Sequence, residues 1–123
     1  MSRYSFSEDS LKKIKKFVRD MSEEKMEVFS SILTTIADSP YVHPSKPGII
    51  KKCHLKDSEL RNPKNNEAGS PREYVGKEKN VNIRVRYVVW EKEKQIKITY
   101  IATTQDAHWF SKSLTIAGKL GAR

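Results

Sequence analysis

The alternation of residue types between positions 81 and 90 constrains the fold of this chain more than any other feature. Apolar side chains occupy every second position there: Val81, Ile83, Val85, Tyr87 and Val89. Arg84 and Arg86 lie between them. Because successive side chains of a strand point to opposite faces, the pattern predicts a strand with one apolar face and one cationic face.

A second alternating run follows after the polar connection EKEKQ. In residues 96–102 the predicted core-facing side chains are Ile96, Ile98, Tyr100 and Ala102, and those between them are Lys97, Thr99 and Ile101. Two such runs joined by a short polar turn predict an antiparallel hairpin whose apolar sets both face the helices. The other face then presents Arg84, Arg86 and Lys97 together.

Two amphipathic helices are expected before these strands. Ser7 is the expected N-cap of a helix that extends to about residue 21, and Ser22 that of a helix from about Glu23 to Asp38. The predicted core stripes are Leu11, Ile14, Phe17, Val18 and Met21 in the first helix, and Met26, Phe29, Ile32, Leu33 and Ile36 in the second. The opposite face of the first helix carries Lys12, Lys13, Lys15, Lys16 and Arg19. Their short connection predicts an antiparallel helical hairpin.

The remaining segments complete an expected α+β fold. Residues 3–7 are a candidate edge strand, residues 49–55 a further strand, and the sequence EYVG the start of another. The polar stretch at about 56–72 predicts a long mobile loop, and residues 112–123 a terminal helix or frayed tail. We therefore expect one domain over residues 1–123, with an N-terminal helical hairpin packed on a small, mainly antiparallel twisted sheet.

The charge balance points to a polyanionic partner. The chain has 24 Lys and Arg against 15 Asp and Glu, a formal net charge of +9. Nucleic acid is the commonest partner of such a surface, and an anionic membrane or an acidic protein is the alternative. The start of the chain, MSRYSFSEDS, is polar, and no apolar run approaches the roughly 20 residues that span a bilayer. A cytoplasmic location without membrane contact is the expectation.

Cysteine and histidine content argues against structural metal sites. The single cysteine, Cys53, excludes an internal disulfide and fits a reducing compartment, most simply as a small buried hydrophobe. The histidines at 43, 54 and 108 do not have the spacing of a zinc site. We expect neither a metal nor a cofactor.

The order of these elements resembles the RelE/ParE superfamily of bacterial toxins. The resemblance lies in a short strand, two helices and an antiparallel sheet whose middle strand carries Arg84, Val85, Arg86 and Tyr87. The last strand leads into the sequence IATTQDAHWF, where many family members have polar residues followed by a His, Tyr or Phe. The match covers about residues 3–112. The stretch around 56–72 is an insertion relative to the family.

The resemblance implies a specific activity. Members of the ribonuclease branch cleave messenger RNA, often on the ribosome, by driving the 2′-hydroxyl onto the adjacent phosphate without a metal. As the toxin of a type II pair, such a protein binds a small acidic antitoxin. The branch that inhibits DNA gyrase lacks the acid and base residues, so a non-catalytic toxin or phage-like inhibitor that binds gyrase, nucleic acid or a host protein is the alternative.

Cleavage through the 2′-oxygen needs a proton acceptor, a proton donor and fixed positive charge beside the phosphate. The predicted catalytic residues are Arg84, His108, Asp106 and Lys52. Arg84 supplies charge in a planar fork that matches phosphate oxygens. His108 carries a proton near neutral pH, and Asp106 orients it or acts as a base. The catalytic lysine of the family could come from either IIKK or YVGKEK.

A second set is predicted to bind RNA without reacting. Its members are Arg86, Lys51, His54, Lys97, Trp109 and Phe110. The aromatic pair could stack on bases or be buried in the core. The two arginines could equally be a solvated surface that binds an anion without catalysis. The enzymatic interpretation requires that the arginines and His108 converge over one hollow.

Overall fold

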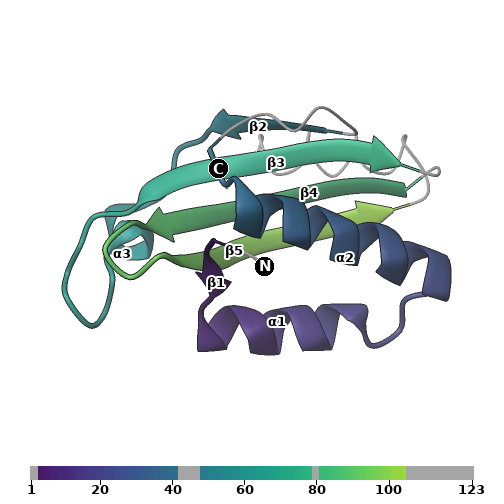
Figure 1. Ribbon diagram of the computed structural model, residues 1–123, viewed down its shortest axis with the longest axis horizontal. Helices are drawn as coiled ribbons and strands as arrows, with labels where there is room; N and C mark the ends of the chain where they lie inside the picture. Colours follow the sequence, from purple (N-terminus) through teal and green to yellow (C-terminus); the bar gives the residue numbers. More distant parts are fainter. Residues whose placement is uncertain (1–2, 42–47, 79–80, 105–123) are drawn as a thin grey trace.

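The computed structural model describes residues 3–41, 48–78 and 81–104. Its strands are β1 (Ser5–Phe6), β2 (Gly48–Lys52), β3 (Ser70–Glu78), β4 (Val81–Trp90) and β5 (Gln95–Thr104). Its helices are α1 (Glu8–Val18), α2 (Glu23–Asp38) and α3 (Asp57–Leu60). The expected terminal helix or tail at 112–123 lies outside the described residues. Figure 1 shows α1 and α2 side by side on one side of the sheet.

The five strands form one mixed sheet in the order β1-β5-β4-β3-β2. The strands β2 to β5 pair antiparallel with their neighbours, and β1 joins β5 in parallel. The expected α+β arrangement of a helical hairpin on a mainly antiparallel sheet is confirmed at this level. Among the described residues no helix has both the length and the apolar character needed to cross a membrane.

Local signals at the helix starts predicted the helices well. The hydroxyl of Ser7 accepts from the backbone N–H of Ser10, and that of Ser22 accepts from the backbone N–H of Lys25. These caps satisfy amides that have no partner within the helix. The second helix has the predicted bounds, whereas the first ends at Val18, before residue 21.

The apolar core lies between this hairpin and the sheet. It includes Val28, Phe29, Ile32 and Ile36 of α2 and Ile83, Val85, Tyr87, Val89, Ile96 and Ile98 of the sheet. Two residues of the predicted stripes are outside it, since Leu11 is 54% exposed and Met26 is 40% exposed. Both lie within the first turn of their helices.

Ser10 fastens α1 to the sheet. Its hydroxyl accepts from the backbone N–H of Ile98 at 2.7 Å and lies 2.8 Å from the hydroxyl of Ser7. The side chain is fully buried. A polar residue therefore sits in the packed face of α1 because it satisfies a backbone donor of β5.

A β-bulge in β5 reverses which side chains face the core. Ile98 pairs with Tyr87, but the next pair is Tyr100 with Arg86, so Thr99 is the additional residue. Beyond it Ile101 packs against the core. The prediction that Tyr100 and Ala102 face the helices was wrong, because an extra residue shifts the alternation by one.

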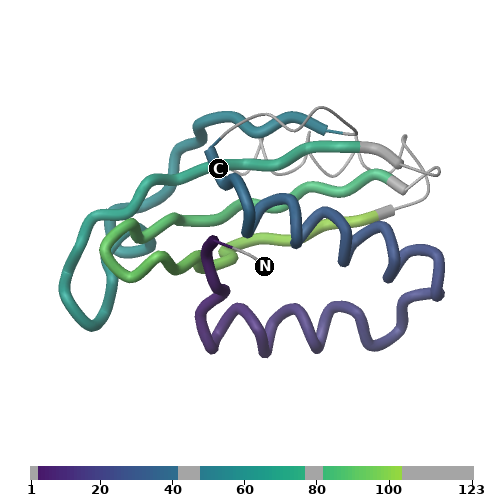
Figure 2. Tube along the Cα trace, viewed as in Figure 1, coloured from purple at the N-terminus to yellow at the C-terminus, as the bar shows by residue number. Residues whose placement is uncertain are grey.

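The segment predicted as a long polar loop contains ordered structure. It holds α3, and its last residues already belong to β3. Leu55 and Leu60 pack with Val88 and Trp90 in a second small core, and the indole N–H of Trp90 donates to the carbonyl of Leu60 at 2.8 Å. Figure 2 shows this segment extending past the ends of the strands.

Gly69 allows the chain before β3 to lie directly against the side chains of Val88 and Trp90. A Cβ placed on it would lie 2.3 Å from Val88 and 2.6 Å from Trp90.

Candidate functional site

A buried carboxylate lies at the centre of the sheet face that the helical hairpin of α1 and α2 does not cover. Glu73 of β3 accepts from Arg84 at 2.9 Å and from Arg86 at 2.7 Å, both on the same carboxylate oxygen. The ammonium of Lys51 is 3.6 Å from the other oxygen. Glu73 is 1% exposed, and the two arginines are 7% and 6% exposed.

Strand pairing brings these groups together. Glu73 is opposite Arg86 in β4 and opposite Lys51 in β2, and Val75 is opposite Arg84. Paired residues of adjacent strands project from the same face, so three strands direct charged side chains to one place. The expectation that Arg84 and Arg86 share a face agrees with this register. Their expected exposure to solvent does not, because both turn onto Glu73.

Arg86 has a further partner on the same face. Its guanidinium lies 5.1 Å from the centre of the Tyr100 ring, a cation–π contact. The β-bulge is what places Tyr100 there, since without it the ring would face the helices. Arg86 is therefore held between a carboxylate and an aromatic ring.

A hollow opens beside this cluster. It is lined by Lys51, Lys52, Cys53, His54, Glu73 and Arg86, and its volume is about 360 Å³. We call it the Glu73 pocket. Two lysines and an arginine face one carboxylate there, so the formal charge of the lining is 3 − 1 = +2 with His54 neutral. Such a pocket attracts anions.

The predicted site residues are distributed unevenly around this pocket. His54 and Lys51 are exposed at it. Lys52 borders it as well, although its partner Arg72 lies on the core-facing side of the sheet. Lys97 pairs with Val88 and lines a different hollow, together with Trp90.

Four predicted site residues lie outside the part of the chain that the structure describes. They are Asp106, His108, Trp109 and Phe110. The convergence of Arg84 and His108 over one hollow therefore stays a prediction. Within the described residues, no cluster of three or more His, Cys, Asp or Glu side chains could hold a metal ion.

Sequence reasoning missed Glu73. The residue lies in SPREYVG, where serine and proline resemble a loop, so the strand was expected to begin only around Glu73 itself. The structure extends β3 back to Ser70. A signal was available, since an acidic residue just before an alternating apolar pair is a plausible cross-strand partner for the arginines.

A second carboxylate is held by several hydrogen bonds in the turn at one end of the central strands. Glu91, in the turn between β4 and β5, accepts from the hydroxyls of Tyr4 and Tyr41 and from the ammonium of Lys94. The Lys94 and Tyr41 hydrogen bonds lower the pKa of Glu91 to about 2. Burial raises the pKa of Tyr41 above its ordinary value, and the hydrogen bond to Glu91 acts in the same direction. This cluster joins the chain start and the end of α2 to the hairpin turn.

The Glu73 pocket combines three kinds of group that act on phosphate esters. A carboxylate can accept a proton, an imidazole can carry one in either direction, and guanidinium and ammonium groups stabilise negative charge on oxygen. Comparison of this chain with protein-family models, with curated proteins and with solved structures finds no match in any of the three.

Proposed function

We propose that this protein is a RelE-like endoribonuclease that cleaves messenger RNA without a metal, acting as the toxin of a toxin–antitoxin pair. The observation that carries the proposal is the Glu73 pocket, where a carboxylate, a guanidinium and two lysines surround a hollow of about 360 Å³ with His54 at its margin. This set supplies a base and phosphate-binding charge within one site.

In the proposed reaction Glu73 accepts the proton of the ribose 2′-hydroxyl as that oxygen attacks the adjacent phosphorus. Arg86 and Lys51 hold the non-bridging phosphate oxygens. The bond from phosphorus to the 5′-oxygen breaks, and that oxygen takes a proton from the imidazolium of His108, the proton carrier predicted from the sequence. The products are a 2′,3′-cyclic phosphate and a 5′-hydroxyl.

The arrangement of elements supports a RelE-like fold for this proposal. The chain runs from an edge strand through two helices into the four-stranded antiparallel series β2 to β5. The sequence Arg84 to Tyr87 lies in β4, a central strand. The net charge of +9 suits both an RNA substrate, free or on the ribosome, and an acidic antitoxin.

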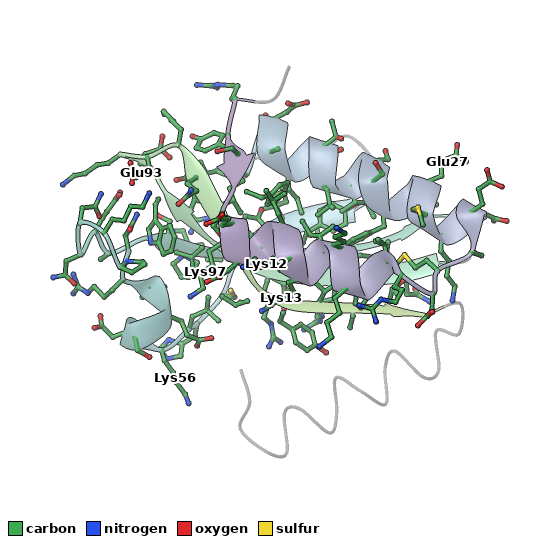
Figure 3. All side chains as sticks on the ribbon, turned by 90° about the horizontal axis from the view of Figure 1, so that it is seen from below. Lys12, Lys13, Glu27, Lys56, Glu93 and Lys97 are labelled. Atoms are coloured by element: carbon green, nitrogen blue, oxygen red, sulfur yellow. The ribbon has the colours of Figure 1, made fainter. Side chains whose placement is uncertain are left out.

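The test maps new 5′ ends in messenger RNA after the protein is expressed. Glu73→Gln and His108→Ala are expected to abolish the new ends, and Lys51→Ala to reduce them. Since Glu73 is buried, circular dichroism must show that its variant is folded. The matched control is Glu93→Gln, an exposed carboxylate in the hairpin turn, labelled in Figure 3. Absence of cleavage by the folded wild type, with and without ribosomes, would refute the proposal.

One observation favours the non-catalytic alternative. Arg84 and Arg86 are both more than nine-tenths buried and hydrogen-bonded to Glu73, which is how arginines serve a purely structural role. A protein that inhibits a host factor by binding alone would retain growth inhibition in His108→Ala. It would lose that inhibition only when several exposed basic residues are removed together.

A further inference from the structure

The outer face of α1 concentrates positive charge. Lys12, Lys15, Lys16 and Arg19 line one hollow of about 510 Å³, here called the cationic hollow. All four are exposed. At about 100° per residue they fall within an arc of roughly 100°, and at 1.5 Å per residue they cover about 10 Å along the axis. Figure 3 looks onto α1 from outside the molecule, with Lys12 and Lys13 labelled.

Helix packing alone does not require this charge. The helix α2 packs on the same sheet, yet it contains four carboxylates and one lysine, a formal charge of 1 − 4 = −3. The two carboxylates of α1 are both in its first turn, so the rest of the helix is cationic. Exposed lysines in such a row repel one another unless an anion lies beside them.

A second hollow adjoins the first and has a different chemistry. It is lined by Lys13, Lys16, Phe17, Thr99, Tyr100 and Ile101, with a volume of about 460 Å³, and we call it the aromatic hollow. Lys16 belongs to both hollows. The second hollow lies between α1 and β5, and Lys13 donates to the carbonyl of Ile98 across that junction.

Tyr100 connects the aromatic hollow to the Glu73 pocket. Tyr100 is one of the residues that line the hollow, and its ring lies 5.1 Å from the guanidinium of Arg86, which lines the pocket. Charge on α1, an aromatic ring at β5 and charge in the pocket thus form one continuous series. Single-stranded nucleic acid is bound by this combination of cations that track the backbone and rings that stack on bases.

We propose that the cationic and aromatic hollows bind single-stranded RNA and lead it to the Glu73 pocket. Phosphates lie along Lys12, Lys15, Lys16 and Arg19, and a base packs against Tyr100 between Lys13 and Lys16. The direction of travel toward a cleavage site rests on the proposed function. The RNA contact itself rests only on α1 and β5.

Fluorescence anisotropy with a labelled single-stranded RNA oligonucleotide tests the contact. The oligonucleotide carries 2′-O-methyl riboses, so it cannot be cleaved through the 2′-oxygen. The triple variant Lys12→Gln, Lys15→Gln, Lys16→Gln is expected to bind at least about tenfold more weakly. Losing three phosphate contacts lowers the slope of log affinity against log salt by about 2, at roughly 0.7 per contact.

The matched control removes the same charge elsewhere. Lys56→Gln, Lys64→Gln, Lys92→Gln changes three exposed lysines that line neither the cationic hollow nor the aromatic hollow. This variant is expected to bind within about threefold of the wild type. Equal weakening in both triple variants would show a general charge effect and overturn the proposed surface.

Tyr100 tests the stacking part separately. Tyr100→Leu is expected to weaken single-stranded binding about tenfold, as for the loss of one stacked base, and Tyr100→Phe to restore it. Binding of duplex RNA is expected to be unchanged by either variant. A duplex that binds the wild type as tightly as the single strand would overturn the single-strand assignment.

The outcomes separate this proposal from the nuclease. An α1 triple variant that binds and cleaves like the wild type overturns the RNA surface and leaves the nuclease standing. A wild type that binds through α1 but generates no new 5′ ends overturns the nuclease and supports the surface. A wild type that binds none of these RNAs overturns the surface.

Discussion

The two faces of the sheet bury neighbouring residues of one strand by different means. On the face covered by the helical hairpin of α1 and α2, Ile83 and Val85 of β4 are completely buried among apolar side chains. On the other face, Arg84 and Arg86 are almost as buried, but they are hydrogen-bonded to Glu73. Apolar burial is non-directional, whereas a buried ion pair needs a partner with the right geometry.

The difference teaches that the second face is specified by pairs of residues. An apolar position accepts several side chains of similar volume, because any of them removes surface from water. A guanidinium in the interior accepts one arrangement, in which the carboxylate is opposite. The charged face is therefore where a single substitution should have the larger effect.

Removing one guanidinium is expected to be the most damaging change. Arg86→Met leaves Glu73 buried with one hydrogen bond fewer, and loss of one partner from a buried ion pair costs about 3–5 kcal/mol. Urea denaturation of the variant and the wild type measures this difference in the free energy of unfolding.

Two further variants show whether the loss of stability in Arg86→Met comes from the unpaired charge of Glu73. Lys51→Met removes a longer ion pair to Glu73, 3.6 Å between the ammonium and the carboxylate oxygen, whose lysine is exposed, and should cost less than about 1 kcal/mol. Combining Arg86→Met with Glu73→Gln should cost less than the sum of the two single changes, because the charge is no longer left unpaired. Strict additivity would contradict the coupling.

A conservative change on the apolar face is expected to cost less. Ile83→Val removes one methylene from a position that is 0% exposed, at about 1 kcal/mol. The same urea measurement applies. A cost equal to that of Arg86→Met would remove the distinction between the faces.

The smallest effect is expected at the exposed carboxylate cluster, and it should depend on pH. Because the folded-state pKa of Glu91 is lowered to about 2 from 4.5, its contribution is present above about pH 4.5 and is lost as the pH falls toward 2. Glu91→Gln should therefore lower the midpoint of thermal unfolding at pH 7 and change it little at pH 2. A deficit that persists unchanged at pH 2 would contradict this assignment.

Local patterns predicted the helices and the central hairpin. The caps at Ser7 and Ser22 and the alternation from Val81 to Trp90 act within a few residues, so they can be recognised without knowing the partners. The same reasoning placed Arg84 and Arg86 on one face. It failed at Tyr100, because a bulge depends on how two strands pair and not on either strand alone.

The candidate site needed long-range information. Glu73 is 11 residues from Arg84 and 13 from Arg86, and it lies behind a serine and a proline that favour a turn. Only the pairing of β3 with β4 identifies it as their partner. Likewise, the ordering of the segment before β3 depends on Trp90, whose indole reaches back to Leu60.

The extra residue Thr99 divides β5 into two halves that direct different alternate positions toward the core. Before it, the side chains of the even-numbered Ile96 and Ile98 face the core and must be apolar. After it, the core-facing side chain is that of the odd-numbered Ile101. If Thr99 instead paired with Arg86 in a regular alternation along β5, the Tyr100 ring would face the core and the Ile101 side chain would face away from it. The bulge in β5 thus determines whether Arg86 has an aromatic ring beside it.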